Sequence, residues 1–185
     1  MLRDEIGPCR RCSLSQGRTE LVFGFGDPRA RVMFVADQPG LAEDEVGLPF
    51  SDDGGRLLGR MIRAMGLSRS EVWLTYLVNC YDRDQQRPEP GLDACESFLA
   101  REIEIVQPEV IIALGQLPAT RLTGVTGQLP HLRGRWHPCR LGGRQTPVMV
   151  TFAPVALIQH PDIKRPVWED LKQVMRRLGL PPPAR

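Results

Sequence analysis

No apolar run in this sequence reaches the roughly 18 residues that a membrane-spanning helix requires. The first residues, MLRDEIGPCRRC, lack the apolar stretch of a secretory signal peptide. Internal repeats and low-complexity segments are absent as well. We therefore expect a globular protein of the cytoplasm with no membrane partner.

The sequence also lacks a strong net charge, because its formal charge at neutral pH is only +2. Composition alone therefore does not indicate a nucleic-acid-binding protein. The distribution is more informative: residues 131–144 contain arginines and no acid, and acids are concentrated in residues 37–53. A basic face of this kind is compatible with phosphate binding. A solvated arginine-rich loop is the alternative interpretation.

The 185 residues, 42% hydrophobic and 25% charged, suit one domain over residues 1–180 followed by a disordered tail at 181–185. Apolar runs predict strands over residues 31–36, 72–78, 109–115 and 147–153. Helical patterns cover residues 55–66, 93–107 and 166–179. Continuous apolar strands alternating with helices predict a three-layer α/β/α sandwich around a four-stranded parallel sheet. The expected sheet core consists of Val32, Phe34, Leu74, Leu77, Ile111, Ala113, Val148 and Val150.

Cysteines form the most distinctive set of residues. They are Cys9, Cys12, Cys80, Cys95 and Cys139. In a cytoplasmic protein, a C-x-x-C pair with two further cysteines indicates a metal site before it indicates disulfides. Zinc and an iron–sulfur cluster both remain open. The wide separation of the second pair favours a cluster, and ordinary buried cysteines are the alternative, above all for Cys139.

The segment ADQPGLAEDEVGLPF, residues 36–50, follows the first predicted strand directly. It places Asp37 at the carboxyl end of a buried strand, where open α/β sheets bind their ligands. A Pro-Gly turn and an aromatic residue, Phe50, follow. The pattern indicates a ligand-binding loop with one carboxylate, although an Asp that only forms the turn would also fit.

Residues 9–58, CRRCSLSQGRTELVFGFGDPRARVMFVADQPGLAEDEVGLPFSDDGGRLL, resemble the opening of the family 4 uracil-DNA glycosylases. These are the iron–sulfur members of the uracil-DNA glycosylase superfamily. The resemblance continues through YLVNC, CESFLAREIEIVQPEVIIALG, LRGRW and TFAPVALIQHPDIKRPVWEDLK, and so covers nearly the whole chain. It implies a four-stranded parallel sheet, a [4Fe–4S] cluster and cleavage of the N-glycosidic bond of a flipped-out uracil.

Roles for individual residues follow from the resemblance. The cluster ligands would be Cys9, Cys12, Cys80 and Cys95. Phe50 occupies the position that stacks on the base, unless it is simply a core aromatic. Asp37 stands where many members have Glu, and its shorter carboxylate would hold the attacking water. Gln38 would contact the base or a phosphate.

Two departures from the family bear on activity. Tyr76 replaces an Asn that reads the edge of uracil, so its ring would intrude on the pocket floor or replace those contacts. Ala153 replaces the His that donates to the uracil oxygen, and one lost donor of this kind costs roughly a hundred- to a thousandfold in rate. His137 or His160 would have to supply the donor instead. We therefore expect weak or altered activity on uracil or another deaminated base.

The remaining features concern DNA. Leu157 or Ile158 would form the apolar wedge that fills the stack after base flipping. The expected phosphate contacts are Arg133, Arg135, Lys164 and Arg165. Asp52 and Asp53, by contrast, place negative charge near the phosphate path and would weaken binding.

These residues support a monomeric glycosylase that acts on damaged or single-stranded DNA at the bacterial nucleoid. A catalytically silent iron–sulfur protein that binds DNA or senses lesions is the main alternative. A nucleotide- or protein-binding module that has abandoned DNA is a third. A covalent cross-linker, suggested by Gln38, is disfavoured because residues 79–90 contain no His.

Overall fold

The computed structural model describes residues 2–83 and 89–181. The predicted tail therefore lies outside the described residues except for its first residue. The elements are α1 (Leu2–Ile6), η1 (Ser13–Gln16), β1 (Phe25–Gly26), β2 (Val32–Ala36), α2 (Leu41–Val46), α3 (Asp53–Ala64), β3 (Trp73–Tyr76), α4 (Glu89–Val106), β4 (Val110–Leu114), α5 (Gln116–Thr123), α6 (Leu129–Leu132), β5 (Trp136–Pro138), β6 (Pro147–Thr151), α7 (Pro154–Gln159), η2 (Pro161–Ile163) and α8 (Lys164–Leu178). Within the described ranges, no helix is both long and apolar enough to cross a membrane.

The sheet has the strand order β1-β3-β2-β4-β6-β5. Its four inner strands run parallel, with Phe34 of β2 opposite Leu74 of β3 and Ile112 of β4, which confirms the predicted parallel core. The edge strands β1 and β5 run antiparallel to their neighbours, so the sheet formed by the described residues has six strands rather than four. Sequence periodicity misses both edges because they contain only two and three residues.

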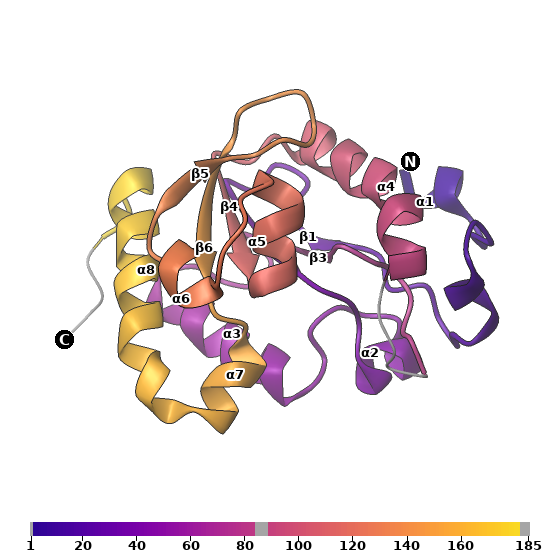
Figure 1. The fold of residues 1–185 in the computed structure, drawn as a ribbon, viewed down its shortest axis with the longest axis horizontal. Helices are drawn as coiled ribbons and strands as arrows, with labels where there is room; N and C mark the ends of the chain where they lie inside the picture. The colour runs from indigo at the N-terminus through magenta and orange to yellow at the C-terminus, as the bar shows by residue number, and fades with distance from the viewer. Residues whose placement is uncertain (1, 84–88, 182–185) are drawn as a thin grey trace.

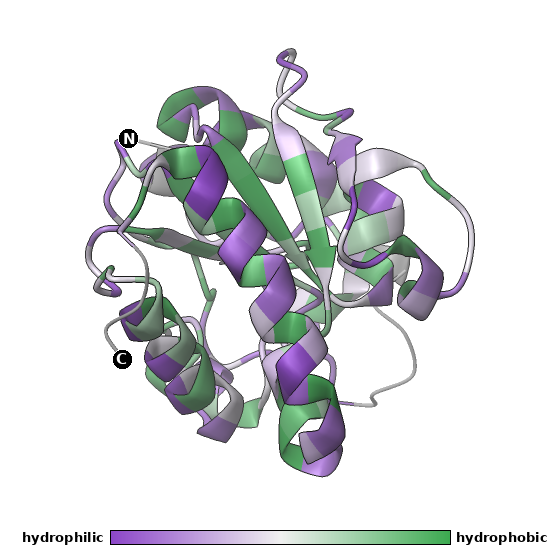
Figure 2. Cartoon of the chain, turned by 90° about the vertical axis from the view of Figure 1, so that its left-hand side faces the viewer, coloured by the Kyte–Doolittle hydropathy of each residue, from purple (hydrophilic) through white to green (hydrophobic). Residues whose placement is uncertain are grey.

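Helices cover both faces of the sheet, which explains why the inner strands are almost wholly apolar. On one face, Met33, Val35 and Ile111 pack with side chains of α4 and α5. On the other, Phe34 and Ile112 pack with side chains of α3 and α8. All eight predicted core residues are buried. Figure 1 shows the helices around the sheet, and Figure 2 shows green strands beneath helices with mixed green and purple turns.

Several element boundaries differ from the prediction. Strand β3 ends at Tyr76, two residues before the predicted end of this strand at residue 78. Helix α4 begins at Glu89 and not at residue 93, which moves Cys95 from the first turn to the second. Helix α3 begins earlier than predicted because the Asp52 side chain accepts from the Gly55 N–H at 2.7 Å and caps it.

The order of the strands creates a crevice at one end of the sheet. From β2 the chain moves outward to β3, and then crosses back to β4 on the other side of β2. Loops that leave the carboxyl ends of β2 and β4 therefore diverge, and open α/β sheets bind ligands at such a point. This end of the sheet faces the lower edge of the molecule in Figure 1, where α2, α7 and the start of α3 lie.

Candidate active site

A cavity of about 170 Å³ lies at the carboxyl ends of the four parallel strands. Asp37 and Gln38 enter it from the loop after β2, and Tyr76 from the end of β3. Phe50 lines it from the segment before α3, and Ala153 from the segment between β6 and α7. The structure thus brings all five residues that we singled out for catalysis and base binding into one pocket.

Asp37 and Ala153 face the same point in this pocket. A Cβ atom placed on Gly115, just after β4, would lie 3.6 Å from Asp37 Oδ1 and 3.8 Å from Ala153 Cβ. Asp37 remains open to solvent, yet the pocket walls remove enough water to raise the pKa of its carboxyl group to about 6. Desolvation is the sole cause of this shift, so no cation or donor of the described residues offsets it.

Phe50 forms a rigid aromatic wall with Tyr76. The two rings stack with centroids 4.8 Å apart and planes 19° from parallel. The Phe50 N–H donates to Tyr76 Oη at 2.9 Å, and burial raises the pKa of that hydroxyl above its ordinary value. Tyr76 therefore lies against Phe50 and leaves the cavity open.

Glu43 fixes the two loops that carry these side chains, a role that sequence reasoning missed. Its Oε1 accepts from the N–H groups of Ser51 and Asp52 at 2.7 and 3.1 Å. Its Oε2 accepts from the Gly40 N–H at 3.0 Å. The available signal was the three-residue spacing from Gly40 to Glu43, which is typical of a capped helix start. The partners in the Phe50 loop could not be read from that spacing.

Arg69 holds the Phe50 loop from behind, and this role was also missed. Its Nη1 donates to the carbonyl oxygens of Phe50 and Gly55 at 3.0 and 3.2 Å. Its Nη2 donates to the Pro49 carbonyl at 2.9 Å. Phe50 itself has φ +56°, a backbone conformation that costs energy for a bulky residue. Such a conformation persists only where the surrounding contacts impose it. A Cβ atom on Gly55 would lie 1.9 Å from the Phe50 oxygen, so only glycine permits this packing.

No histidine lines the pocket within the described ranges. His131 and His160 are exposed, and the His137 ring bonds the Leu132 carbonyl at 3.2 Å from edge strand β5. The position of Ala153 therefore lacks the donor that the family resemblance leads one to expect.

Four of the five cysteines gather where the N-terminal segment meets α4. Burial raises the pKa of the Cys80 thiol, and that of Cys95 to about 11, and the thiols of Cys9 and Cys12 contribute to both shifts. Arg18 Nη1 donates to Cys80 Sγ at 3.0 Å, and its Nη2 donates to the Cys9 carbonyl at 2.7 Å. Within residues 2–83 and 89–181, no group of three or more possible ligands has the geometry for a single metal ion.

Arg133 does not point its charge at a DNA surface. Its Nε donates to Asp170 Oδ2 at 3.0 Å, its Nη2 pairs with Oδ1 of the same residue, and Nη2 also donates to the Pro166 carbonyl. The Asp170 side chain is fully buried and also accepts from Thr151 Oγ1 at 2.6 Å. The ion pair joins the segment after α6 to α8, and Thr151 joins β6 to the same carboxylate. Since Asp170 takes up its charge, the expected phosphate contact by Arg133 is not retained. Arg135, Lys164 and Arg165 are exposed.

The expected wedge also needs a correction. Leu157 is only 2% exposed and packs into the core, so it is not free to enter a base stack. Ile158, the alternative on the same helix, is 48% exposed, and Val155 is 51% exposed. The apolar tip of α7 therefore consists of Val155 and Ile158.

Comparison with known proteins identifies the family of the chain. The family model of the Uracil DNA glycosylase superfamily matches residues 23–172. A type-4 uracil-DNA glycosylase from Sulfurisphaera tokodaii is 32% identical over 98% of this chain and 84% of its own length. One from Thermotoga maritima is 33% identical over 94% and 91%. A type-5 uracil-DNA glycosylase from Thermus thermophilus is 29% identical over 65% and 60%.

The matched region contains the whole pocket, from the loop after β2 to the start of α7. The similarity to the type-4 proteins extends over both cysteine-bearing segments as well, because it spans nearly the entire chain. The chain belongs to the uracil DNA glycosylase superfamily, as a divergent relative of its type-4 members.

Proposed function

We propose that this chain is a DNA glycosylase that hydrolyses the N-glycosidic bond of a flipped-out damaged base, uracil or another deaminated base. The observation that carries the proposal is the pocket at the strand ends, which joins an aromatic wall to a carboxylate that has no partner in the described part of the chain. The names of the relatives, uracil-DNA glycosylases, support the same class of reaction.

Each pocket residue has a chemical role in this proposal. Phe50, held by Tyr76, presents a flat face on which the everted base stacks. Gln38 offers an amide to the edge of the base, and its Oε1 is buried without a hydrogen-bond partner in the described chain. Asp37 positions the water that attacks the sugar carbon and accepts its proton. In this proposal Tyr76 acts through Phe50 and does not read the base edge.

Uracil removal should be slow, because Ala153 cannot donate to the oxygen of the departing base. One missing donor of this type costs about 2.7–4 kcal/mol of transition-state stabilisation, or roughly a hundred- to a thousandfold in rate. The shortened Asp37 adds to the loss, since about 1 Å of misplacement can cost roughly a hundredfold.

The test is excision from single- and double-stranded oligonucleotides that contain uracil, hypoxanthine or xanthine, read as strand cleavage at abasic sites. We expect slow product formation that Asp37→Asn abolishes. Asp93→Asn, on the exposed face of α4, is the matched control and should retain the activity. If no substrate gives more product than Asp37→Asn does, the catalytic proposal fails. A silent protein that binds DNA or senses lesions then becomes the better interpretation, with Tyr76 and Ala153 as its cause.

The DNA-facing surface in this proposal surrounds the mouth of the pocket. Val155 and Ile158 supply the apolar wedge at the tip of α7. Lys164 and Arg165, in the first turn of α8, supply phosphate contacts, and Arg135 is a further candidate. Positive side chains at a helix start oppose the helix dipole, so their position there is better explained by an external anion than by helix stability.

We further propose that Cys9, Cys12, Cys80 and Cys95 hold a [4Fe–4S] cluster. Four thiols that influence one another fit the donor set of such a cluster, while a single zinc ion would need its four sulfurs about 3.8 Å apart around Zn–S bonds of about 2.3 Å. The cluster would tie the N-terminal segment to the loop after β3 and to α4, and it has no part in hydrolysis.

The cluster proposal predicts brown protein with broad absorbance near about 400 nm. Cys95→Ser should lose the colour and most of the bound iron. Cys139→Ser is the matched control, because Cys139 is also buried but contacts the Leu141 carbonyl and not the other thiols. Equal iron content in both variants would contradict the assignment.

A further inference from the structure

The charged side chains that line the pocket are all of one sign. Among the described lining residues, Asp37, Glu43 and Asp52 carry carboxylates, and no lysine, arginine or histidine is present. Arg69 lies behind the Phe50 loop, where it donates to three backbone carbonyls. Its charge acts on Glu43 and Tyr76, and not on Asp37. The pocket therefore offers a departing base no cation and no positively charged donor.

The three carboxylates are not equally screened. Glu43 accepts three backbone N–H bonds, and Asp52 accepts one as the cap of α3. For Asp37, desolvation alone determines the shift of the pKa. When it is ionised, Asp37 thus has no partner among the described residues that compensates its charge, and it lies near the methyl group of Ala153.

This electrostatic field discriminates between leaving groups. Uracil departs as an anion, and neighbouring carboxylates raise the energy of that anion. A base that is already cationic departs as a neutral molecule, because the bonding electron pair moves onto its ring nitrogen and cancels the charge. Such a base needs no donor at the position of Ala153. It is also attracted to the electron-rich faces of Phe50 and Tyr76 by cation–π interaction.

We propose that this pocket selects positively charged, N-alkylated single-ring bases, of which 3-methylcytosine is the representative. The inference rests on the proposed hydrolysis of an N-glycosidic bond, and it extends the substrates from deaminated bases to this alkylated class. A water oxygen bonds to the sugar C1′, the C1′–N1 bond breaks, and its electron pair goes to N1. The water proton passes to Asp37 and then to solvent, so that an abasic site and a neutral base remain. The cavity of about 170 Å³ suits one ring better than two.

The test compares 3-methylcytosine with uracil at the same position of one oligonucleotide. The two bases have similar size and differ chiefly in charge. We expect 3-methylcytosine to be excised faster by about tenfold or more, the effect of one modest charge interaction. Asp37→Asn should remove both activities and provides the background.

Two variants test the electrostatic cause. Ala153→His restores a donor and should raise uracil excision by up to roughly a hundred- to a thousandfold, which reverses the preference. Asp52→Asn retains a residue that caps helices well while removing one charge, so it should lower the preference for the cationic base without unfolding α3.

The outcomes separate the two proposals. If neither base is excised above the Asp37→Asn background, the glycosylase function itself fails. If uracil is excised as fast as or faster than 3-methylcytosine, the function stands and the inferred substrate class is overturned. A preference for 3-methylcytosine that neither Ala153→His nor Asp52→Asn changes would overturn the electrostatic explanation.

Discussion

At the scale of single residues, Tyr76 shows how one substitution changes a neighbour's environment. The sequence places it where an amide would read the base, and from this we inferred that its ring would intrude on the pocket floor or replace the contacts to the base edge. The structure instead directs its ring against Phe50 and its hydroxyl to the Phe50 N–H. The sequence shows which residue type occupies the position, but the side-chain direction depends on a loop 26 residues earlier in the chain.

Tyr76→Phe should destabilise the protein and slow excision. The variant keeps the stacked ring but removes the acceptor for the buried Phe50 N–H, and an unsatisfied buried group costs about 1–3 kcal/mol. Urea unfolding measures the loss. Tyr81→Phe, at the protein's other tyrosine, is the matched control, and we expect a change within about 0.5 kcal/mol there. Equal losses in the two variants would show that the Tyr76 hydroxyl does not support the Phe50 loop.

At the scale of elements, the inner strands were predictable and many short helices were not. A continuous apolar run such as residues 109–115 clearly predicts a buried strand, and β4 occupies the centre of this run. Helix α7, with six residues, is too short for a periodic signal, and it begins at Pro154 after a predicted strand. Because this helix was not predicted, the sequence could not show which of Leu157 and Ile158 is exposed. Neighbouring positions of a helix point about 100° apart, and of these two residues Leu157 is buried and Ile158 is exposed.

Helix α4 is joined to the sheet by a buried acid, Glu102. Its Oε2 accepts from Trp73 Nε1 at 2.9 Å, and Thr75 and the Gly24 N–H also donate to the carboxyl group. Burial outweighs these bonds and raises the pKa of Glu102 from 4.5 to about 7. The folded state therefore favours the protonated acid. Its contribution to stability is complete below about pH 4.5 and is lost as the pH rises through about 7.

Glu102→Gln should flatten the pH dependence of stability. The amide cannot ionise and still accepts a hydrogen bond, so the variant should lose less unfolding free energy than the parent between pH 5 and pH 8. The difference should approach about 3 kcal/mol, from roughly 1.36 kcal/mol per pKa unit. Urea unfolding across that range measures it, and other titrating groups cancel between the two proteins. Glu104→Gln, exposed on the same helix, should behave like the parent. Parallel curves for the parent and Glu102→Gln would refute the pKa shift as the cause.

At the scale of the whole molecule, Asp37 could be predicted from its place after a buried strand, and Tyr76 and Ala153 from the family resemblance. They lie together because the carboxyl ends of parallel strands meet at one edge. Asp37, Tyr76 and Ala153 each follow or end such a strand. Long-range pairs were not predictable in the same way. Arg133 belongs to a basic stretch in the sequence, yet its charge is taken up by Asp170, 37 residues away. A stretch of positive charge therefore indicates a DNA surface only after its internal partners are known.

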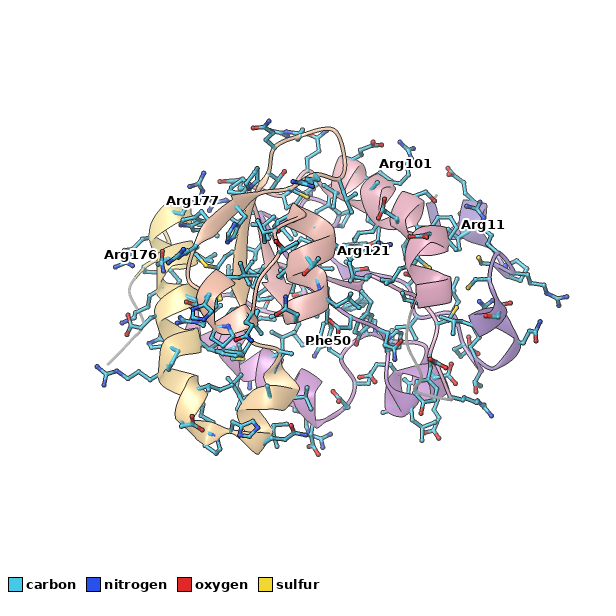
Figure 3. All side chains as sticks on the ribbon, viewed as in Figure 1. Arg11, Phe50, Arg101, Arg121, Arg176 and Arg177 are labelled. Atoms are coloured by element: carbon cyan, nitrogen blue, oxygen red, sulfur yellow. The ribbon has the colours of Figure 1, made fainter. Side chains whose placement is uncertain are left out.

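Lys164 and Arg165 remain as exposed cations beside the tip of α7, and Figure 3 shows Phe50 in the lower half of the molecule with Arg101 at its upper edge. If the edge of the molecule that carries Lys164 and Arg165 binds DNA, removing these two charges should weaken the salt dependence of binding. Removing Arg101, at the opposite edge, should not. Each phosphate contact releases counterions, so affinity falls as the salt concentration rises. In a plot of the logarithm of affinity against the logarithm of salt concentration, each contact contributes about 0.9 to the downward slope for a duplex, or about 0.7 for a single strand.

The double variant Lys164→Gln, Arg165→Gln should therefore reduce this salt slope by about 1.8 on duplex DNA or about 1.4 on a single strand. Fluorescence anisotropy with a labelled oligonucleotide at several salt concentrations measures the slope. The matched control is Arg101→Gln, Arg144→Gln, which removes the same charge from exposed arginines of α4 and the loop between β5 and β6. A specific binding edge leaves the control slope unchanged. An equal reduction in both variants would mean that the affinity for DNA depends only on net charge. The α7–α8 edge would then not be the binding surface.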